Sequence, residues 1–136
     1  MFAMLKMGRE KDPENILREE MLKERAEVLG RAGEKLAAAL EKMKTIEQDI
    51  DGRLKQFRMV AKKYEENGDD DKLVSMKKDI AGEINREIGK FNRAREYAKL
   101  RYYYLIVTRE AMGMRRHHWV DEWYRIPPRK PHFRNL

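Results

Sequence analysis

A series of large apolar residues spaced seven positions apart runs through the first half of the chain and constrains its fold more than any other feature. The spacing is typical of a coiled coil, because a seven-residue repeat keeps one face of an α-helix apolar. Smaller apolar residues three and four positions along broaden this stripe, so we expect its partner surface to be wide or shared. The series consists of Leu22, Leu29, Leu36, Met43, Ile50, Phe57 and Tyr64.

Residues that favour helix ends flank this series. Asp12 can cap a helix, and Pro13 fits the first turn because a proline has no N–H group to leave unsatisfied there. Asn67 and Gly68 favour a left-handed C-terminal cap. The pattern therefore predicts a helix over residues 13–66, about 80 Å long at a rise of 1.5 Å per residue.

The second half of the chain repeats the helical spacing as far as Met112, and no proline interrupts it before Pro127. The turn between the two helices, near residues 67–70, is short enough to require that they run antiparallel, with residue i opposite a residue near 137 minus i. The predicted fold class is therefore all-α, a long antiparallel two-helix hairpin of coiled-coil type. Its predicted segments are an apolar N-terminal segment at 1–11, the hairpin at 12–112, and a basic aromatic extension and tail at 113–136.

Six consecutive bulky residues, Tyr102 to Val107, lie in the second helix opposite small residues of the first. A buried β-strand is the alternative interpretation, since aromatic and β-branched residues favour sheets. As a helix, the six side chains would turn through more than a full circle, so one neighbouring helix cannot cover them all. The candidates for the remaining cover are residues 1–7, the C-terminal tail, a second copy of the chain and a foreign protein.

The last 25 residues differ from the rest of the chain. Residues 114–125 can prolong the second helix as a short aromatic extension, which would place Trp119 and Trp123 one turn apart. Residues 126–131 cannot be helical because prolines remove backbone donors and force their neighbours into extended geometry. We therefore expect an extended tail, rich in proline and arginine, at the C-terminus.

Few residues in the chain could support catalysis. There is no cysteine, Ser75 is the one serine, and no glycine elbow surrounds it. The glycine-rich stretch at 30–35 does not have P-loop spacing, and its position within the seven-residue repeat favours close helix packing. We expect no enzyme, no catalytic residue, no cofactor and no small-molecule substrate.

The three histidines are the remaining candidates for metal ligation. His117 and His118 could each share a helical face with a carboxylate four residues on, but the Glu-x-x-His motif of bundle di-iron sites is absent. These pairs are therefore interpreted as exposed helix pairs, and no metal site is predicted.

Positive charge and aromatic residues are concentrated in the second half of the chain. Residues 85–136 hold 13 Lys and Arg against 5 Asp and Glu, a net charge of +8, whereas the whole chain carries +7, so residues 1–84 carry −1. Such residues are enriched at protein interfaces, but they can also neutralise phosphates and stack on bases. Candidate partner-binding residues are Tyr103, Tyr104, Ile106, Val107, Trp119, Trp123 and Tyr124. Candidate nucleic-acid-binding residues are Arg115, Arg116, Arg125, Arg129, Lys130 and Arg134.

These observations predict a non-catalytic structural or adaptor subunit that docks through its basic, aromatic C-terminal end into a homo-oligomer or a larger protein assembly. The alternative is an RNA-binding or ribonucleoprotein-associated subunit that uses the same end. No apolar run approaches the roughly 20 residues that a membrane span needs, and the opening apolar residues are too few for a signal peptide. We expect an intracellular protein, cytoplasmic or in an organelle.

Overall fold

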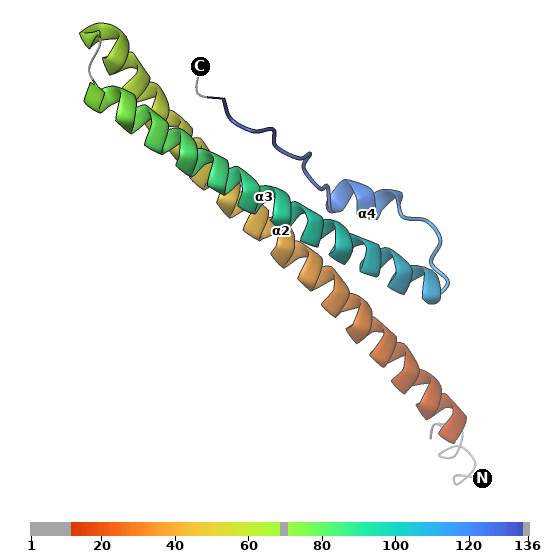
Figure 1. The fold of residues 1–136 in the computed structure, drawn as a ribbon. Helices are drawn as coiled ribbons and strands as arrows, with labels where there is room; N and C mark the ends of the chain where they lie inside the picture. Colours follow the sequence, from red (N-terminus) through yellow and green to blue (C-terminus); the bar gives the residue numbers. More distant parts are fainter. Residues whose placement is uncertain (1–11, 69–70, 135–136) are drawn as a thin grey trace, which may run out of the picture.

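The computed structural model describes residues 12–68 and 71–134. Within this part of the chain there is no strand, and residues 112–117 and 124–134 lie outside the helices. Its helices are α2 (Pro13–Asn67), α3 (Asp71–Ala111) and α4 (His118–Trp123). The long helices α2 and α3 pack against each other in opposite directions, and the chain then turns back along them (Figure 1). The all-α prediction is confirmed. The alternative strand at Tyr102–Val107 is wrong, because these residues lie inside α3, and the predicted apolar segment at 1–11 lies outside the described residues.

Both predicted ends of the first helix are present in the structure. The Oδ1 atom of Asp12 accepts a hydrogen bond of 2.8 Å from the backbone N–H of Asn15, and Pro13 occupies the first turn. At the other end, α2 includes Asn67, one residue more than predicted. Gly68 follows at a φ of 71° and donates its N–H to the carbonyl oxygen of Tyr64 at 2.9 Å. A positive φ suits glycine because it has no Cβ to clash with the backbone.

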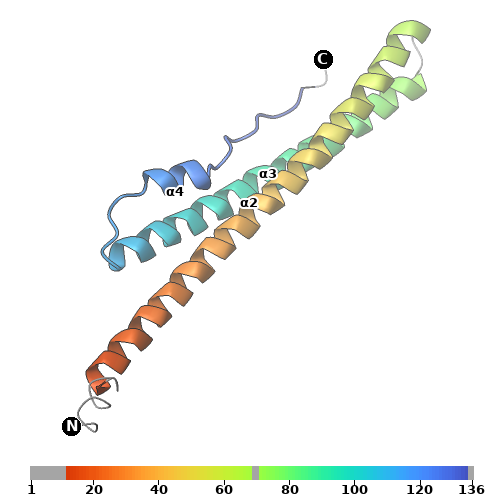
Figure 2. The same cartoon turned by 180° about the vertical axis from the view of Figure 1, so that it is seen from behind.

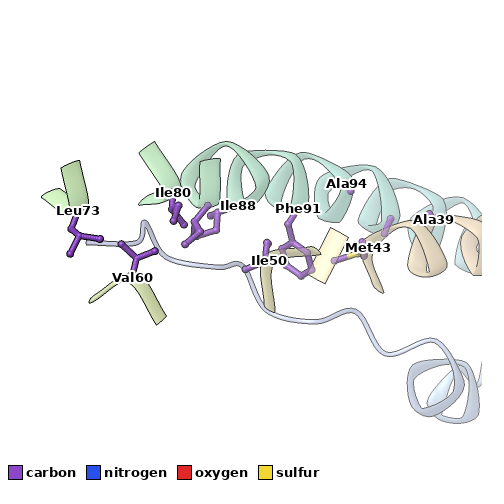
Figure 3. Packing of buried hydrophobic residues seen from close by; sticks show 11 residues of the cluster. Ala39, Met43, Ile50, Val60, Leu73, Ile80, Ile88, Phe91 and Ala94 are labelled. Atoms are coloured by element: carbon purple, nitrogen blue, oxygen red, sulfur yellow. The ribbon is translucent and has the colours of Figure 1, made fainter. Parts of the chain in front are cut away.

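The main core lies between α2 and α3 and consists of aliphatic side chains from both helices around one phenylalanine, Phe91 (Figure 3). Met43 and Ile50 of the seven-residue series are buried there, and they pack with Ile84 and Phe91 of α3. Each such side chain, fully buried, stabilises the fold by about 1.5–3 kcal/mol relative to leaving it exposed. The part of the predicted apolar stripe that includes Met43 and Ile50 therefore holds the two helices together, whereas its first member, Leu22, is exposed.

An ion pair across the two helices marks their register. Arg53 on α2 bonds through Nη1 to Glu83 on α3, and the two residue numbers add to 136, close to the predicted sum of 137. Arg53 also donates from Nε to Oδ2 of Asp49 at 3.0 Å, and this hydrogen bond lowers the pKa of the Asp49 carboxyl. The charged pairs line the edge of the contact, where water screens them, so they contribute less to stability than the apolar core.

The first helix is longer than its partner. α2 has 55 residues and α3 has 41, so 14 residues of α2, about 21 Å of helix, have no counterpart in α3. Figures 1 and 2 show this end of α2 extending past the end of α3. We call residues 13–28 the overhang: it comprises these 14 residues and the next two, and every one of the 16 is exposed. Its exposed apolar side chains are Ile16, Leu17, Met21, Leu22 and Val28.

The helix α3 ends at Ala111, so the interpretation in which residues 114–125 prolong it is wrong. Gly113 has a φ of 87°, and its N–H donates to the carbonyl oxygen of Glu110 at 2.9 Å. The N–H of Met114 donates to the carbonyl oxygen of Arg109, also at 2.9 Å. Paired hydrogen bonds of this kind, closed by a glycine at positive φ, form a Schellman C-cap that ends a helix and turns the chain.

The assignment of the Schellman C-cap can be tested by substituting Gly113. Gly113→Ala should lower the free energy of unfolding by about 1 kcal/mol, because an alanine is strained at positive φ although its Cβ would meet no atom within 4 Å. The control is Gly82→Ala in the middle of α3, where the Cβ also meets nothing. That change should raise the free energy of unfolding by about 0.5–1 kcal/mol, since alanine is the better helix former. Urea denaturation followed by circular dichroism measures both, and equal effects would contradict the assignment of the turn.

Candidate functional site

A second, smaller core joins α4 to the end of the helix pair. It consists of Leu36 from α2, Leu105 from α3 and Val120 from α4, and both Leu36 and Val120 are completely buried. Tyr124, directly after α4, packs on the same cluster. Its hydroxyl lies where a Cβ at Gly33 would come within 3.3 Å. The glycine-rich stretch at 30–35 is thus helical and includes a close approach between α2 and the segment after α4.

Arg109 is the one buried charged residue among the described residues, at 6% exposure, and it organises the turn that leads to α4. Its Nη2 atom donates to the carbonyl oxygen of Arg116 at 2.9 Å, and Nε donates to Nδ1 of His117 at 3.3 Å. The guanidinium carbon lies 4.8 Å from the centroid of the Trp119 ring. A guanidinium group can serve all three partners at once because it is planar and has five N–H donors.

The predicted partner-binding residues divide into an exposed set and a covered set. Tyr103 is 61% exposed and Trp123 is 77% exposed. Tyr104, Val107 and Trp119 are exposed to a lesser degree. Ile106 and Tyr124 are instead partly buried against the Leu36 cluster. We call the exposed set, Tyr103, Tyr104, Val107, Trp119 and Trp123, the aromatic end. Part of the tyrosine region is therefore covered by the C-terminal segment of the same chain, one of the four candidates considered.

The C-terminal end of the overhang, near residue 28, lies beside the aromatic end. A groove of about 440 Å³ is lined by Ala26 and Leu29 of α2 together with Arg109 of α3 and Trp119 of the returning segment. Small residues, Gly30, Gly33 and Ala37, form its floor on α2. The inner end of the overhang and one residue of the aromatic end, Trp119, thus line the same groove.

The C-terminal tail lies along α3 and is held by two asparagine side chains. The amide of Asn85 donates from Nδ2 to the carbonyl oxygen of Phe133 at 2.9 Å and accepts the Phe133 N–H at Oδ1, at 2.7 Å. Asn92 makes the same pair of hydrogen bonds with Lys130, both at 2.9 Å. Arg95 adds a hydrogen bond of 2.8 Å from Nε to the carbonyl oxygen of Pro127. The tail is therefore held through its backbone at every third residue.

The side chains of Lys130 and Phe133, the two residues bound by Asn92 and Asn85, also contact the helix pair. The ring of Phe133 meets the ring of Phe57 on α2 edge to face, with centroids 5.0 Å apart. Lys130 places its Nζ atom 2.9 Å from Oε2 of Glu47 and 4.8 Å from the ring centroid of Phe91. Aromatic pairs and cation–π contacts in such partly buried sites each contribute about 0.5–1.5 kcal/mol. We call Asn85, Asn92 and Arg95, together with Glu47 and Phe57, the tail-docking face.

The predicted nucleic-acid-binding residues are not equivalent in the structure. Lys130 is engaged with Glu47 and Phe91 inside the tail-docking face. The other five are exposed, and none of them forms an ion pair within the described part of the chain. They are Arg115, Arg116, Arg125, Arg129 and Arg134. A further basic and aromatic contact lies on α3, where Arg101 sits 5.0 Å from the ring centroid of Tyr97 and 5.8 Å from that of Tyr104.

The histidines lie apart from any set of metal ligands in the described ranges. His117 contacts Oε1 of Glu110 through Nε2 at 3.2 Å, and its contact with Asp121 is a backbone hydrogen bond at the start of α4. Within residues 12–68 and 71–134, no three histidine or carboxylate side chains gather so that they could hold a metal ion. Among the described helices, none has both the length and the apolar character that crossing a bilayer requires.

Sequence reasoning missed Asn85, Asn92, Arg95 and Arg109. A signal was present for the two asparagines: they are spaced seven apart in a helix, although asparagine is a poor helix former. An asparagine inside a helix does not favour the helix itself, so its presence suggests that the side-chain amide makes a hydrogen bond elsewhere. Nothing marked Arg109 itself; the available signal for the turn that it organises was Gly113, because glycine favours the C-cap that ends a helix. The chain matches no protein-family model, no curated protein and no solved structure.

Proposed function

We propose that this chain is a non-catalytic structural or adaptor subunit in which α2 and α3 form an antiparallel coiled-coil hairpin. The subunit docks through its basic, aromatic C-terminal end into a homo-oligomer or a larger protein assembly. The observation that carries the proposal is the exposure of the aromatic end, where five large side chains stay in contact with water after the chain has folded back on itself. Exposed aromatic residues gathered at one place favour a protein contact.

The overhang supports a second copy of the chain as the partner. Residues 13–28 hold five Glu against three Lys and Arg, a net charge of −2, whereas residues 85–136 carry +8. In an antiparallel pair of chains, the overhang of each copy would extend past the end of its own α3 toward the aromatic end of the other. Apolar side chains and opposite charges would then meet on both sides of a two-fold axis.

Charge placed in the overhang tests this proposal. Wild-type chain should form a dimer at tens of micromolar concentration, and Leu17→Glu/Leu22→Glu should weaken the dimer at least tenfold, because two carboxylates would replace apolar contacts. Sedimentation equilibrium on the full chain measures both dissociation constants. Raising the salt concentration should weaken the wild-type dimer as well, since the complementary charges are screened.

The control places the same two charges on exposed apolar residues at the opposite end of the helix pair. Met59→Glu/Val74→Glu changes one residue of α2 and one of α3, and both are exposed. The dimer should keep its wild-type dissociation constant in this variant. A wild-type chain that stays monomeric at all accessible concentrations would exclude the homo-oligomer, and equal weakening in both variants would exclude the overhang as the contact.

The second candidate function is RNA binding, and one observation favours it. Five exposed arginines at the C-terminal end form no ion pair within the described residues, so their charge is available to phosphates. Binding to single-stranded RNA should then weaken steeply between 50 and 200 mM salt, because bound phosphates release counterions. Fluorescence anisotropy with a labelled oligonucleotide measures this, and Arg125→Gln/Arg129→Gln/Arg134→Gln should reduce both the affinity and the salt slope. Affinity that does not change with salt would exclude this function.

A further inference from the structure

The spacing of the tail clamps matches the geometry of an extended peptide. In a polyproline II helix three residues complete one turn and advance about 9.3 Å. Seven residues of an α-helix, the separation of Asn85 and Asn92, advance about 10.5 Å. The backbone groups that Arg95, Asn92 and Asn85 bind belong to residues 127, 130 and 133, which have the three-residue spacing expected of such a peptide.

The positions of the prolines agree with this arrangement. Lys130 and Phe133 are not prolines, so each has a backbone N–H group. These N–H groups donate to the side-chain oxygens of Asn92 and Asn85. The prolines at 127, 128 and 131 fall where no backbone N–H is needed. Proline also reduces the entropy that the tail loses on docking, because it already favours the extended conformation.

The amides of Asn85 and Asn92 bind backbone groups of the tail and make no hydrogen bond to the side chains of its described residues. An asparagine amide that donates to a carbonyl and accepts from the N–H of the same residue treats any non-proline residue alike. Selectivity comes from two side-chain contacts with α2. Glu47 forms an ion pair with the lysine of the tail, and Phe57 packs against the aromatic ring three residues further along the tail. Together these groups have the parts of a peptide-binding site, with main-chain hydrogen bonds for affinity and side-chain contacts for specificity.

We propose that the tail-docking face is a binding site for extended peptides that carry a lysine and, three residues on, an aromatic residue, with no proline at either position. The chain's own tail occupies the site as an intramolecular ligand and must leave before another peptide can bind. This proposal is independent of the dimer proposed above, because the site lies along Asn85–Arg95 of α3 and not at the overhang.

A synthetic peptide with the sequence of residues 125–136 is the probe. The full chain carrying Lys130→Pro/Phe133→Pro has lost both clamped N–H groups and both side-chain contacts, so its own tail is released. This variant should bind the labelled peptide in fluorescence anisotropy. Wild-type chain should bind the peptide at least about tenfold more weakly, since a tethered tail competes at an effective concentration of order millimolar.

Two matched controls separate specific docking from adhesion of a basic peptide. Adding Asn85→Ala/Asn92→Ala to the tail-released chain should weaken peptide binding at least about tenfold, because four hydrogen bonds are lost. A peptide with prolines at the positions of Lys130 and Phe133 should not bind. A peptide with proline at the position of His132 should bind like the parent peptide, since the tail makes no hydrogen bond through that N–H.

Each outcome decides the proposal. Peptide binding that is stronger in the tail-released chain than in wild type, and that needs Asn85 and Asn92, supports it. Binding of equal strength in wild-type and tail-released chains would overturn it, because the tail would then not compete for the site. Absence of binding to a tail-released chain that is still folded by circular dichroism would overturn it as well.

Discussion

Leu36→Ala is expected to lower the free energy of unfolding by about 2–5 kcal/mol, the range measured when a large buried aliphatic side chain is cut to alanine. Leu36 has no exposed surface and contacts residues of α3 and α4, so its loss leaves a cavity where three segments meet. Those segments cannot collapse into the cavity without separating other contacts, which places the expected cost in the upper part of the range. Urea denaturation monitored by circular dichroism measures it.

Leu22→Ala is the matched control, because Leu22 belongs to the same seven-residue series but is 58% exposed in the overhang. In dilute solution this change should alter the free energy of unfolding by about 0.5 kcal/mol or less. If a second copy covers the overhang, the cost of Leu22→Ala should rise with protein concentration, because binding stabilises the folded state by mass action. A large cost at every concentration would contradict the exposure of the overhang within a single chain.

Val120→Asp is expected to release α4 and the turn before it from the helix pair. Val120 is completely buried against Leu36 and Leu105, and an unpaired carboxylate there would lose its hydration. The chain escapes this cost by undocking α4, so the free energy of unfolding should fall by at least about 2 kcal/mol. Far-ultraviolet circular dichroism should stay near wild type, because the main core around Phe91 does not include Val120.

The readout for this undocking is tryptophan fluorescence. Trp119 contacts the guanidinium group of Arg109 in the docked state, and its emission should move to longer wavelength when that contact is replaced by water. The control is His118→Asp, which adds a carboxylate to an exposed position of the same helix. It should change the free energy of unfolding by about 0.5 kcal/mol or less. A red shift of equal size in both variants would show that α4 is not held by its buried valine.

The predictions from the sequence succeeded where one local pattern fixes the structure. The spacing of apolar residues gave the long helices, and Asp12 and Gly68 gave the ends of the first one, because caps and helical periodicity depend on residues within a turn or two of each other. The two helices also have equal rise per residue and a short connection, so the sum of paired residue numbers follows from the turn alone. The Arg53–Glu83 pair agrees with it to one residue.

The candidate site was only partly predictable, and Trp119 and Tyr124 show why. Both belong to a segment rich in aromatic residues, and nothing local separates the one that stays exposed from the one that packs on Leu36. Their different exposure depends on how α4 packs against the helix pair after the chain reverses at Gly113. The use of Lys130 was likewise hidden, because Glu47 and Phe91 are distant from it in the sequence and meet it only after the tail has docked.

The sequence by itself determined that this chain forms two long helices joined by a sharp turn, since periodicity and caps are local properties. Only the tertiary structure decided that the C-terminal segment returns along the helix pair and that Asn85 and Asn92 hold it there. That contact joins residues 38 and 48 positions apart. Its free energy comes from backbone hydrogen bonds and ring contacts that exist only when the helix pair is already formed, and no single stretch of sequence contains them.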